Sequence, residues 1–290
     1  MSTDDNQSRP ARRLTLGGVL LTVLTIIAAA IWFTPVYWAI VTSLRADQAT
    51  VTEFTLFPTD PTLENYIFGI VNSQLPIWYL NSTIVAVAVT VVAVFTAACT
   101  GYAISQLHFP GRRVLWWIIL ASFMIPVPAL IVNHYIIIAG LKPFYPVLGL
   151  NTHLGMILPM LLTPVTVIVY KGFFDGVPRE FREAAVMDGA TEFQLFGRVF
   201  LPMNWGVTTA MAIITFIGAW NSFLWPFLAV QREEMMTVTV GITAVQDAFG
   251  VAYGRILSGA VLASLPVALA YLLFQRRVTQ AIALSAGIKG

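Results

Sequence analysis

Six long stretches of this 290-residue chain contain no Asp, Glu, Lys or Arg and are dominated by apolar residues. Apolar runs of ~20 residues can cross a ~30 Å hydrocarbon core as an α-helix, which satisfies its own backbone hydrogen bonds. We therefore predict an all-α membrane protein with six transmembrane helices, at 14–44, 79–104, 114–138, 154–172, 203–230 and 256–275. Together they form one transmembrane domain over 14–277, between an N-terminal tail at 1–13 and a C-terminal tail at 278–290.

Composition strengthens this prediction. Only 10% of the residues are Asp, Glu, Lys or Arg, against about 25% in soluble domains, while 58% are hydrophobic and the mean hydropathy is +0.79. Such a chain cannot cover a water-soluble globule with polar surface, which excludes a soluble enzyme, a disordered chain and a free nucleic-acid binder. The single cysteine, Cys99, lies in an apolar run, so neither a disulfide framework nor a cysteine metal site is expected.

The basic residues collect on one side of the predicted topology. With six spans the two termini share a side, and that side holds 12 of the 16 Lys and Arg residues. The positive-inside rule then predicts a multi-pass plasma-membrane protein with both termini in the cytoplasm. The segments 45–78 and 232–254 are expected to face outward.

Prolines recur within or at the ends of the predicted spans. Each lacks an N–H and frees a carbonyl, which is tolerated at membrane depth when neighbours or a water-filled cavity satisfy the backbone. Two interpretations stay open, ordinary kinked helices and broken helices around a pathway. The residues are Pro35, Pro126, Pro128, Pro159, Pro164, Pro202, Pro226 and Pro266.

The membrane interior lacks the groups that several kinds of membrane protein need. The six charge-free stretches contain no acidic or basic side chain, which disfavours a proton-coupled carrier, although a sodium site built from carbonyls stays possible. The candidate bases His108, His134 and His153 have no acid at helical spacing, so we expect no catalytic residue and no metal site. The P-loop pattern G-x-x-x-x-G-K-[ST] is absent, so ATP-driven work requires a partner.

The densest charged segment, 171–198, lies between the fourth and fifth predicted spans. Pro178 suits a first helical turn, and Glu180 and Glu183 are favourable near a helix N-terminus. Gly189 offers a stop. We predict a short amphipathic helix from about Pro178 to Asp188, which either rests on lipid headgroups or docks against another protein.

This segment resembles the EAA loop of ABC-importer permeases, E-A-A-x3-G-x9-I-x-L-P. Glu183-Ala184-Ala185 is followed by Gly189, and then by Val199 and Leu201-Pro202 at the same spacing. The fuller form EAAxxDGA is also present. Later segments are similar to sugar-importer permeases related to the smaller permease subunit of the maltose transporter, namely Trp220-Asn221 with Pro226, Pro266 with Gln275-Arg276, and the end Gly287-Ile288-Lys289-Gly290.

The resemblance implies a type I ABC importer permease fold in a bacterial inner membrane, with the segment from about Pro178 to Asp188 as the coupling helix. It implies that Glu183 is a charged anchor, that Ala184 and Ala185 form a close-packing face, and that Gly189 makes the sharp turn. The residues implied in coupling to the ATPase are Glu183, Ala184, Ala185, Asp188, Gly189, Ala190, Phe196 and Pro202, with a tail contact through Gly287 and Lys289.

The resemblance also implies partners. These are two ATP-binding subunits, which hold the ATP and Mg that this chain does not bind, a second and different permease, and an extracytoplasmic solute-binding protein. Segment 232–254, with Met235, Met236, Gly241 and Phe249, is the expected contact for the solute-binding protein, unless it is a plain surface loop.

Uncharged spans rich in aromatic and amide groups suit a sugar or related polyol. The pathway candidates are Asn204, Trp220, Asn221 and Trp225, and the competing interpretation is helix packing or interface anchoring. A solute carrier or channel that acts without ATPase partners is the alternative function.

Overall fold

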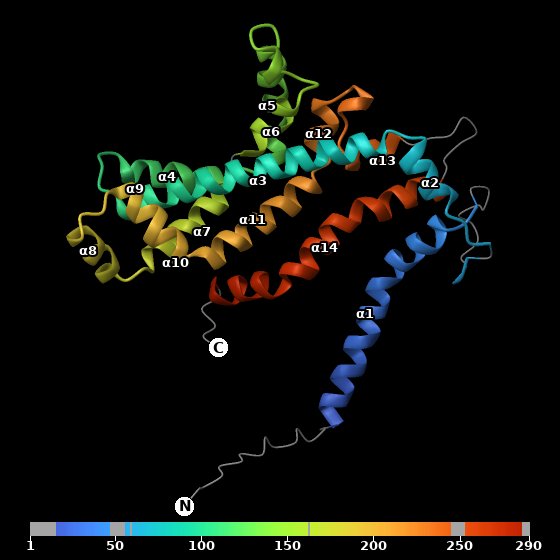
Figure 1. The fold of residues 1–290 in the computed structure, drawn as a ribbon, viewed down its shortest axis with the longest axis horizontal. Helices are drawn as coiled ribbons and strands as arrows, with labels where there is room; N and C mark the ends of the chain where they lie inside the picture. Colours follow the sequence, from blue (N-terminus) through green and yellow to red (C-terminus); the bar gives the residue numbers. More distant parts are fainter. Residues whose placement is uncertain (1–15, 47–55, 59, 162, 245–252, 286–290) are drawn as a thin grey trace, which may run out of the picture.

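The computed structural model describes residues 16–46, 56–58, 60–161, 163–244 and 253–285, and these form helices and no strand (Figure 1). The predicted all-α fold is confirmed. The α-helices are α1 Leu16–Ser43, α2 Glu64–Val71, α3 Leu75–Gln106, α4 Arg112–Phe123, α5 Val127–Leu141, α6 His153–Ile157, α7 Pro164–Asp175, α8 Arg179–Met187, α9 Glu192–Leu195, α10 Leu201–Met203, α11 Trp205–Trp220, α12 Leu224–Ala229, α13 Val238–Ala244 and α14 Tyr253–Ser285. Short turns η1 Pro146–Leu148, η2 Leu158–Leu161 and η4 Glu233–Met235 are 3₁₀-helical, and η3 Phe196–Phe200 is π-helical.

Within the described residues, three helices are long and apolar enough to cross a membrane, α1, α3 and the 253–275 part of α14. Three further spans are reached when bent pairs are taken together, α4 with α5, α6 and η2 with α7, and 192–203 with α11. The bends are 102°, 47° and 80°. Length and composition thus allow the six predicted spans, and the helices in three of them are broken rather than only kinked.

Prolines account for the position of two breaks. Pro126 precedes α5 with an extended backbone, and its missing N–H leaves α4 to end at Phe123. Pro202 lies in α10 directly after the π-helical turn η3, and α11 starts anew beyond Asn204. The helix in the predicted span 203–230 ends at Trp220, before α12, whereas α14 continues past 275 into the predicted tail.

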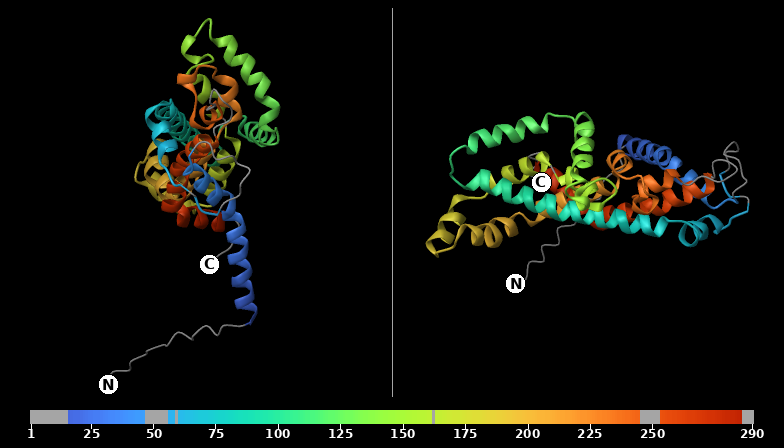
Figure 2. Two further views of the ribbon diagram at one scale, coloured as in Figure 1. Left: turned by 90° about the vertical axis from the view of Figure 1, so that its right-hand side faces the viewer. Right: turned by 90° about the horizontal axis from the view of Figure 1, so that it is seen from above.

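Helix α3 is the central element. It packs against α7 and α11, and α14 lies along α11. Helix α1 joins the bundle at its C-terminal end, where 37–40 are partly buried and Val41–Ser43 are buried, and its part at 16–36 stands away with its apolar side chains exposed (Figure 2). We name the two ends of the bundle after the helices that mark them, the α8 end and the α2 end.

Candidate functional site

The amphipathic helix predicted from about Pro178 to Asp188 is present as α8, which runs from Arg179 to Met187. Pro178 precedes it with an extended backbone, and Glu180 lies in its first turn, where a carboxylate is favourable beside the helix dipole. At its other end Gly189 has a φ of +79°, and the N–H groups of Gly189 and Ala190 donate to the carbonyls of Val186 (2.9 Å) and Ala185 (3.0 Å). This is the Schellman arrangement, which requires a left-handed residue and so explains the glycine.

The chain then turns into α9 through a capping box. The Thr191 side chain accepts from the Gln194 N–H, and the Gln194 side chain accepts from the Thr191 N–H at 2.8 Å. This reciprocal pair fixes the first turn of α9 and therefore the position of Glu192.

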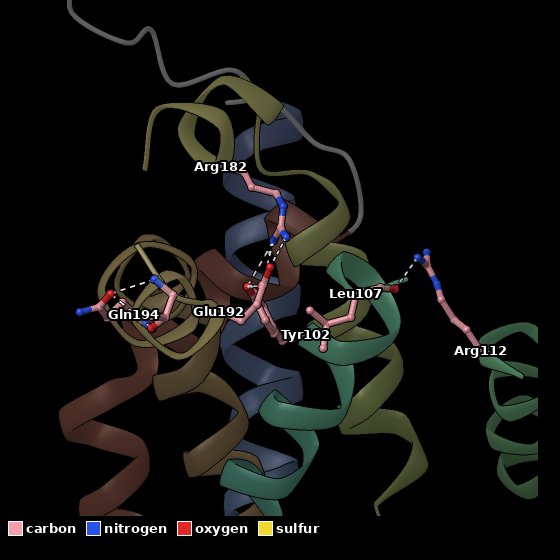
Figure 3. A network of polar contacts seen from close by, with 7 residues as sticks. Tyr102, Leu107, Arg112, Arg182, Glu192 and Gln194 are labelled. Carbon is pink, nitrogen blue, oxygen red and sulfur yellow. Dashed lines mark hydrogen bonds and ion pairs between the residues drawn. The ribbon is translucent and has the colours of Figure 1, made fainter. Parts of the chain in front are cut away.

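Glu192 connects three elements in one polar network (Figure 3). Its carboxylate pairs with both terminal nitrogens of the Arg182 guanidinium on α8, and it accepts from the Tyr102 hydroxyl on α3 at 2.6 Å. Arg182 also donates to the Tyr102 oxygen at 3.3 Å. We call Tyr102, Arg182 and Glu192 the inner latch, because it ties α8 and α9 to the last turns of α3.

The electrostatics of the latch favour the charged pair. Burial acts to raise the pKa of the Glu192 carboxyl, but hydrogen bonds from Arg182 and Tyr102 and the charge of Arg182 outweigh it and lower that pKa from its ordinary value. The hydrogen bond to Glu192 is the main cause that raises the pKa of Arg182. Because the Glu192 side chain is 46% exposed, the ion pair alone contributes at most about 1 kcal/mol to stability. Its main effect is to fix the orientation of α8 relative to α9 through hydrogen bonds of defined geometry.

An aromatic core supports the latch from below. The Tyr102 ring is 5% exposed and packs against Phe174, Phe196 and Phe200, with ring centroids 5.2–6.1 Å apart. At the residue directly before Tyr102, α3 and α7 approach so closely that a Cβ on Gly101 would lie 2.7 Å from the Tyr170 Cβ. The α8 end of α3 is therefore packed rigidly before any polar contact is counted.

A comparison with known protein families matches most of the chain to one family. Residues 90–283, well over half of the chain, match the family described as "Binding-protein-dependent transport system inner membrane component". The chain belongs to this family. It is therefore a subunit of a membrane transport system, and we refer to it below as the permease.

Individual relatives agree with the family. The permease is 27% identical over 276 residues to the arabinooligosaccharides transport system permease protein AraQ of Bacillus subtilis (strain 168), covering 94% of this chain and 96% of that one. It is 32% identical over 226 residues to the sn-glycerol-3-phosphate transport system permease protein UgpE of Salmonella typhi, covering 76% and 78%.

A solved structure supports the fold. The permease superposes with a TM-score of 0.78 on a chain in the crystal structure of a bacterial ABC transporter involved in the import of the acidic polysaccharide alginate. The match covers 93% of this chain and 99% of that chain at 20% identity. The fold is thus the type I ABC importer permease fold expected from the sequence.

The structure divides the predicted coupling residues between two faces. Glu183, Ala184, Asp188 and Gly189 are exposed around α8. In contrast, Ala185 packs half-buried against the aromatic core, as do two other members of the predicted set, Ala190 and Phe196. Pro202 is exposed on α10. The two alanines of the motif therefore do not share one free face.

Sequence reasoning missed two kinds of residue at this end. Tyr102 and Glu192 complete the latch, but no periodicity links positions so far apart in the chain. Met187 and Phe193 are 87% and 90% exposed. Large apolar side chains inside a charged segment are a signal that could have indicated them, because exposed apolar groups often mark contact surfaces.

Three of the four pathway candidates are buried inside the bundle and donate hydrogen bonds to backbone carbonyls there. Trp220 and Trp225 are buried, and their indole N–H groups donate to the carbonyls of Ala263 and Met156, each at 3.0 Å. The buried Asn204 amide donates to the Phe200 carbonyl at 2.9 Å. These contacts fit the competing interpretation, helix packing, whereas Asn221 is exposed.

Other candidates fall on different parts of the molecule. Gly287, Lys289 and Phe249 lie outside the described residues. Met235 and Met236 are half-buried, and Gly241 packs directly on the Trp78 indole.

A cavity of about 440 Å³ between α3, α4, α5 and α7 is lined mainly by aliphatic groups, with polar Thr96, Thr100, Ser122, His134 and Thr163. Within the described ranges, no group of three His, Cys, Asp or Glu residues could hold a metal ion.

Proposed function

We propose that the permease forms half of the translocation pathway of an ATP-driven importer for a sugar or related polyol, and that α8 couples it to the ATPases. The support for import is the family and the named substrates of relatives, an arabinooligosaccharide and sn-glycerol-3-phosphate. Oligosaccharides and glycerol phosphate share hydroxyl-rich chemistry, so the proposed solute is polyhydroxylated.

The observation that carries the coupling role is the geometry of α8. It projects from one end of the bundle and exposes Glu183, Ala184 and Met187, while Arg182 and Ala185 hold it to the body. A short helix with a charged group, a small residue and an apolar group on its free face suits a groove on a partner protein.

In this proposal the α8 end faces the cytoplasm, as do both termini. ATP binding closes two ATPase subunits, and the docked helices move with them. The bundle then changes from inward-facing to outward-facing, and hydrolysis resets it. In this proposal the ATPase subunits hold the nucleotide, and this chain contributes the difference in stability between its two states rather than chemistry on the solute.

The remaining partners follow from the same proposal. A second, different permease supplies the other half of the pathway, and a solute-binding protein docks on segment 232–254, whose described residues lie at the α2 end. The apolar surface of α1 lies in the membrane, against lipid or the second permease. Asn221 is the pathway candidate that we retain, because its side chain is exposed.

The competing function is a carrier or channel without ATPases, and affinity purification separates the two. The tagged permease is purified gently from its native membrane, and each co-purifying chain is identified by mass spectrometry. We expect a P-loop ATPase and a second permease in defined ratio. Recovery of the permease alone, with transport that survives reconstitution without ATP, would refute the importer.

The variant Glu183→Lys tests the coupling helix itself. Reversing the charge on the free face of α8 should reduce the amount of ATPase recovered, or leave ATP hydrolysis without uptake, because the partner surface then meets a like charge. Glu64→Lys is the matched control for ATPase recovery, since Glu64 lies on α2 at the opposite end. Normal assembly and uptake in Glu183→Lys would contradict the assignment.

A further inference from the structure

Helix α3 is continuous between the two ends of the bundle. It runs for 32 residues from Leu75 to Gln106, about 48 Å at 1.5 Å per residue. The spans formed by α4 and α5, by α6 and α7, and by α10 and α11 are all broken by bends. An unbroken helix moves as one body, so groups fixed to its two ends move together.

At the α8 end, polar side chains of α3 hold the coupling segment. The Tyr102 hydroxyl belongs to the inner latch with Arg182 and Glu192. One turn further, Ser105 donates to the Asp175 carboxylate at 2.6 Å, and Gln106 donates to the Phe174 carbonyl at 3.1 Å. The segments on both sides of α8 are therefore attached to the same helix.

At the α2 end, three buried side chains of α3 hold the backbone of segment 233–238. The Trp78 indole N–H donates to the Glu233 carbonyl at 2.8 Å. The Asn81 amide donates to the carbonyls of Glu234 (2.9 Å) and Met236 (3.0 Å), and the Ser82 hydroxyl accepts from the Val238 N–H at 2.8 Å. These side chains are 2–4% exposed. We call Trp78, Asn81 and Ser82 the outer latch.

The outer latch is specific rather than incidental. The carbonyl oxygen of Asn81 also lies 2.9 Å from His153 Nε2, so both ends of this amide are used. A Cβ on Gly241 would come within 2.1 Å of the Trp78 ring, so α13 is pressed against the same helix. Buried polar groups fully satisfied in this way define one arrangement of the segment, because any slip leaves them unpaired.

We propose that α3 is the rigid connection that carries movement of α8 to segment 233–238, with Tyr102 and Asn81 as positioning residues at its two ends. This inference rests on the proposed function, in which ATPases move α8. Energetic coupling between sites is reciprocal. Docking of a protein on segment 233–238 should therefore act back on α8 through the same helix.

The test follows the outer segment while the ATPases are driven. The complex is purified with its ATPases from the native membrane, the single cysteine is removed as Cys99→Ser, and Glu234→Cys carries an environment-sensitive fluorophore on an exposed side chain. The readout is the fluorescence change on adding Mg-ATP. ATPase recovery is measured in the same samples, which separates docking from transmission.

Tyr102→Phe is the central variant, because it removes the latch hydroxyl and keeps the ring in its aromatic core. The matched control is Tyr271→Phe, whose side chain lies exposed on α14. We expect Tyr102→Phe to reduce the ATP-driven change about fivefold, the lower end of coupling factors between sites, with ATPase recovery unchanged. The control should respond like the parent. Asn81→Ala should abolish the response from the other end.

A charge swap separates the ion pair from general disruption. Arg182→Glu and Glu192→Arg should each reduce the response at least as much as Tyr102→Phe, and the double variant should restore it to within about twofold of the parent.

A response within about twofold of the parent in Tyr102→Phe and Asn81→Ala, with the ATPases bound, would overturn the inference. A parent whose ATPases bind but whose outer label does not respond would also overturn it. If no ATPase accompanies the parent, the proposed function fails, and the inference fails with it.

Discussion

Replacing Gly189 by alanine isolates the backbone requirement at the end of α8. Gly189 has a φ of +79°, and a Cβ built on it would meet no atom within 4 Å. Alanine therefore meets no steric clash with its surroundings, and the cost comes from the left-handed backbone alone. For an L-residue that cost is about 1–2 kcal/mol. The equilibrium between the capped and the opened end of α8 should shift toward opening by about 5- to 30-fold.

Hydrogen exchange measures this opening at two amides. The N–H groups of residues 189 and 190 donate to the carbonyls of Val186 and Ala185, so both should lose protection together in Gly189→Ala. Gly189→Asn should lose less, because asparagine tolerates the left-handed region better. Gly197→Ala is the matched control, since Gly197 lies in the helical turn η3 and a Cβ there also meets nothing within 4 Å.

Two results would refute this reasoning. One is unchanged protection of both amides in Gly189→Ala, which would mean that the turn tolerates an L-residue at no cost. The other is equal loss in Gly197→Ala, which would mean that the effect reports a general loosening of the α8 end. A loss confined to Gly189→Ala should weaken recovery of the ATPases by no more than that factor, and only to the extent that the opened form becomes populated, because affinity falls in proportion to the fraction of α8 that is formed.

Three further predictions concern packing and pH. Gly101→Ala should lower the free energy of unfolding by about 1–3 kcal/mol, because its Cβ would meet the Tyr170 Cβ and the Lys171 backbone, whereas Gly172→Ala has open space; thermal unfolding of the purified complex compares them. Trp225→Phe should lower the free energy of unfolding by about 1–3 kcal/mol, because it leaves the buried Met156 carbonyl unpaired. Trp117→Phe, at a 62% exposed position, should lower it little, and equal losses in the two variants would show that burial does not decide the size of the effect. Because Arg182 and Tyr102 lower the pKa of Glu192, the inner latch is complete above the ordinary glutamate range and is lost as pH falls through the lowered pKa. The fluorescence response of the Glu234→Cys label should therefore be constant from about pH 8 to 6. A decline of that response within this range would contradict the ion pair.

The sequence predicted the features that depend on local pattern. Apolar length alone indicated α1, α3 and α14, because a membrane span is recognised by composition without knowledge of its neighbours. The short helix α8 and its stop were also local, since Pro178 and Gly189 act through their own backbone angles. The proline pattern left kinked and broken helices open, and the bends of 102° and 80° depend on tertiary packing that no single proline encodes.

The side-chain partners were not predictable in the same way. Tyr102 lies 90 residues before Glu192, and Trp78 lies 155 residues before Glu233. Each pair meets only after three or more helices have packed. Similarly, the aromatic residues assigned to a solute pathway have the composition of one, but Trp220 and Trp225 spend their N–H groups on helix carbonyls. Residue type indicates what a side chain can bind, whereas burial decides whether it is available.

The two alanines of the EAA motif lie on different faces of α8, which the sequence motif did not predict. Arg182 and Ala185 are three residues apart and share the face of α8 that packs on the bundle, through the latch and the aromatic core. Glu183 and Met187 are four apart and share the exposed face. Ala184 is exposed and Ala185 is not, so a partner groove can approach the first closely but cannot reach the second. A larger side chain at 184 should therefore disturb docking, whereas one at 185 should first displace α8 from its own core.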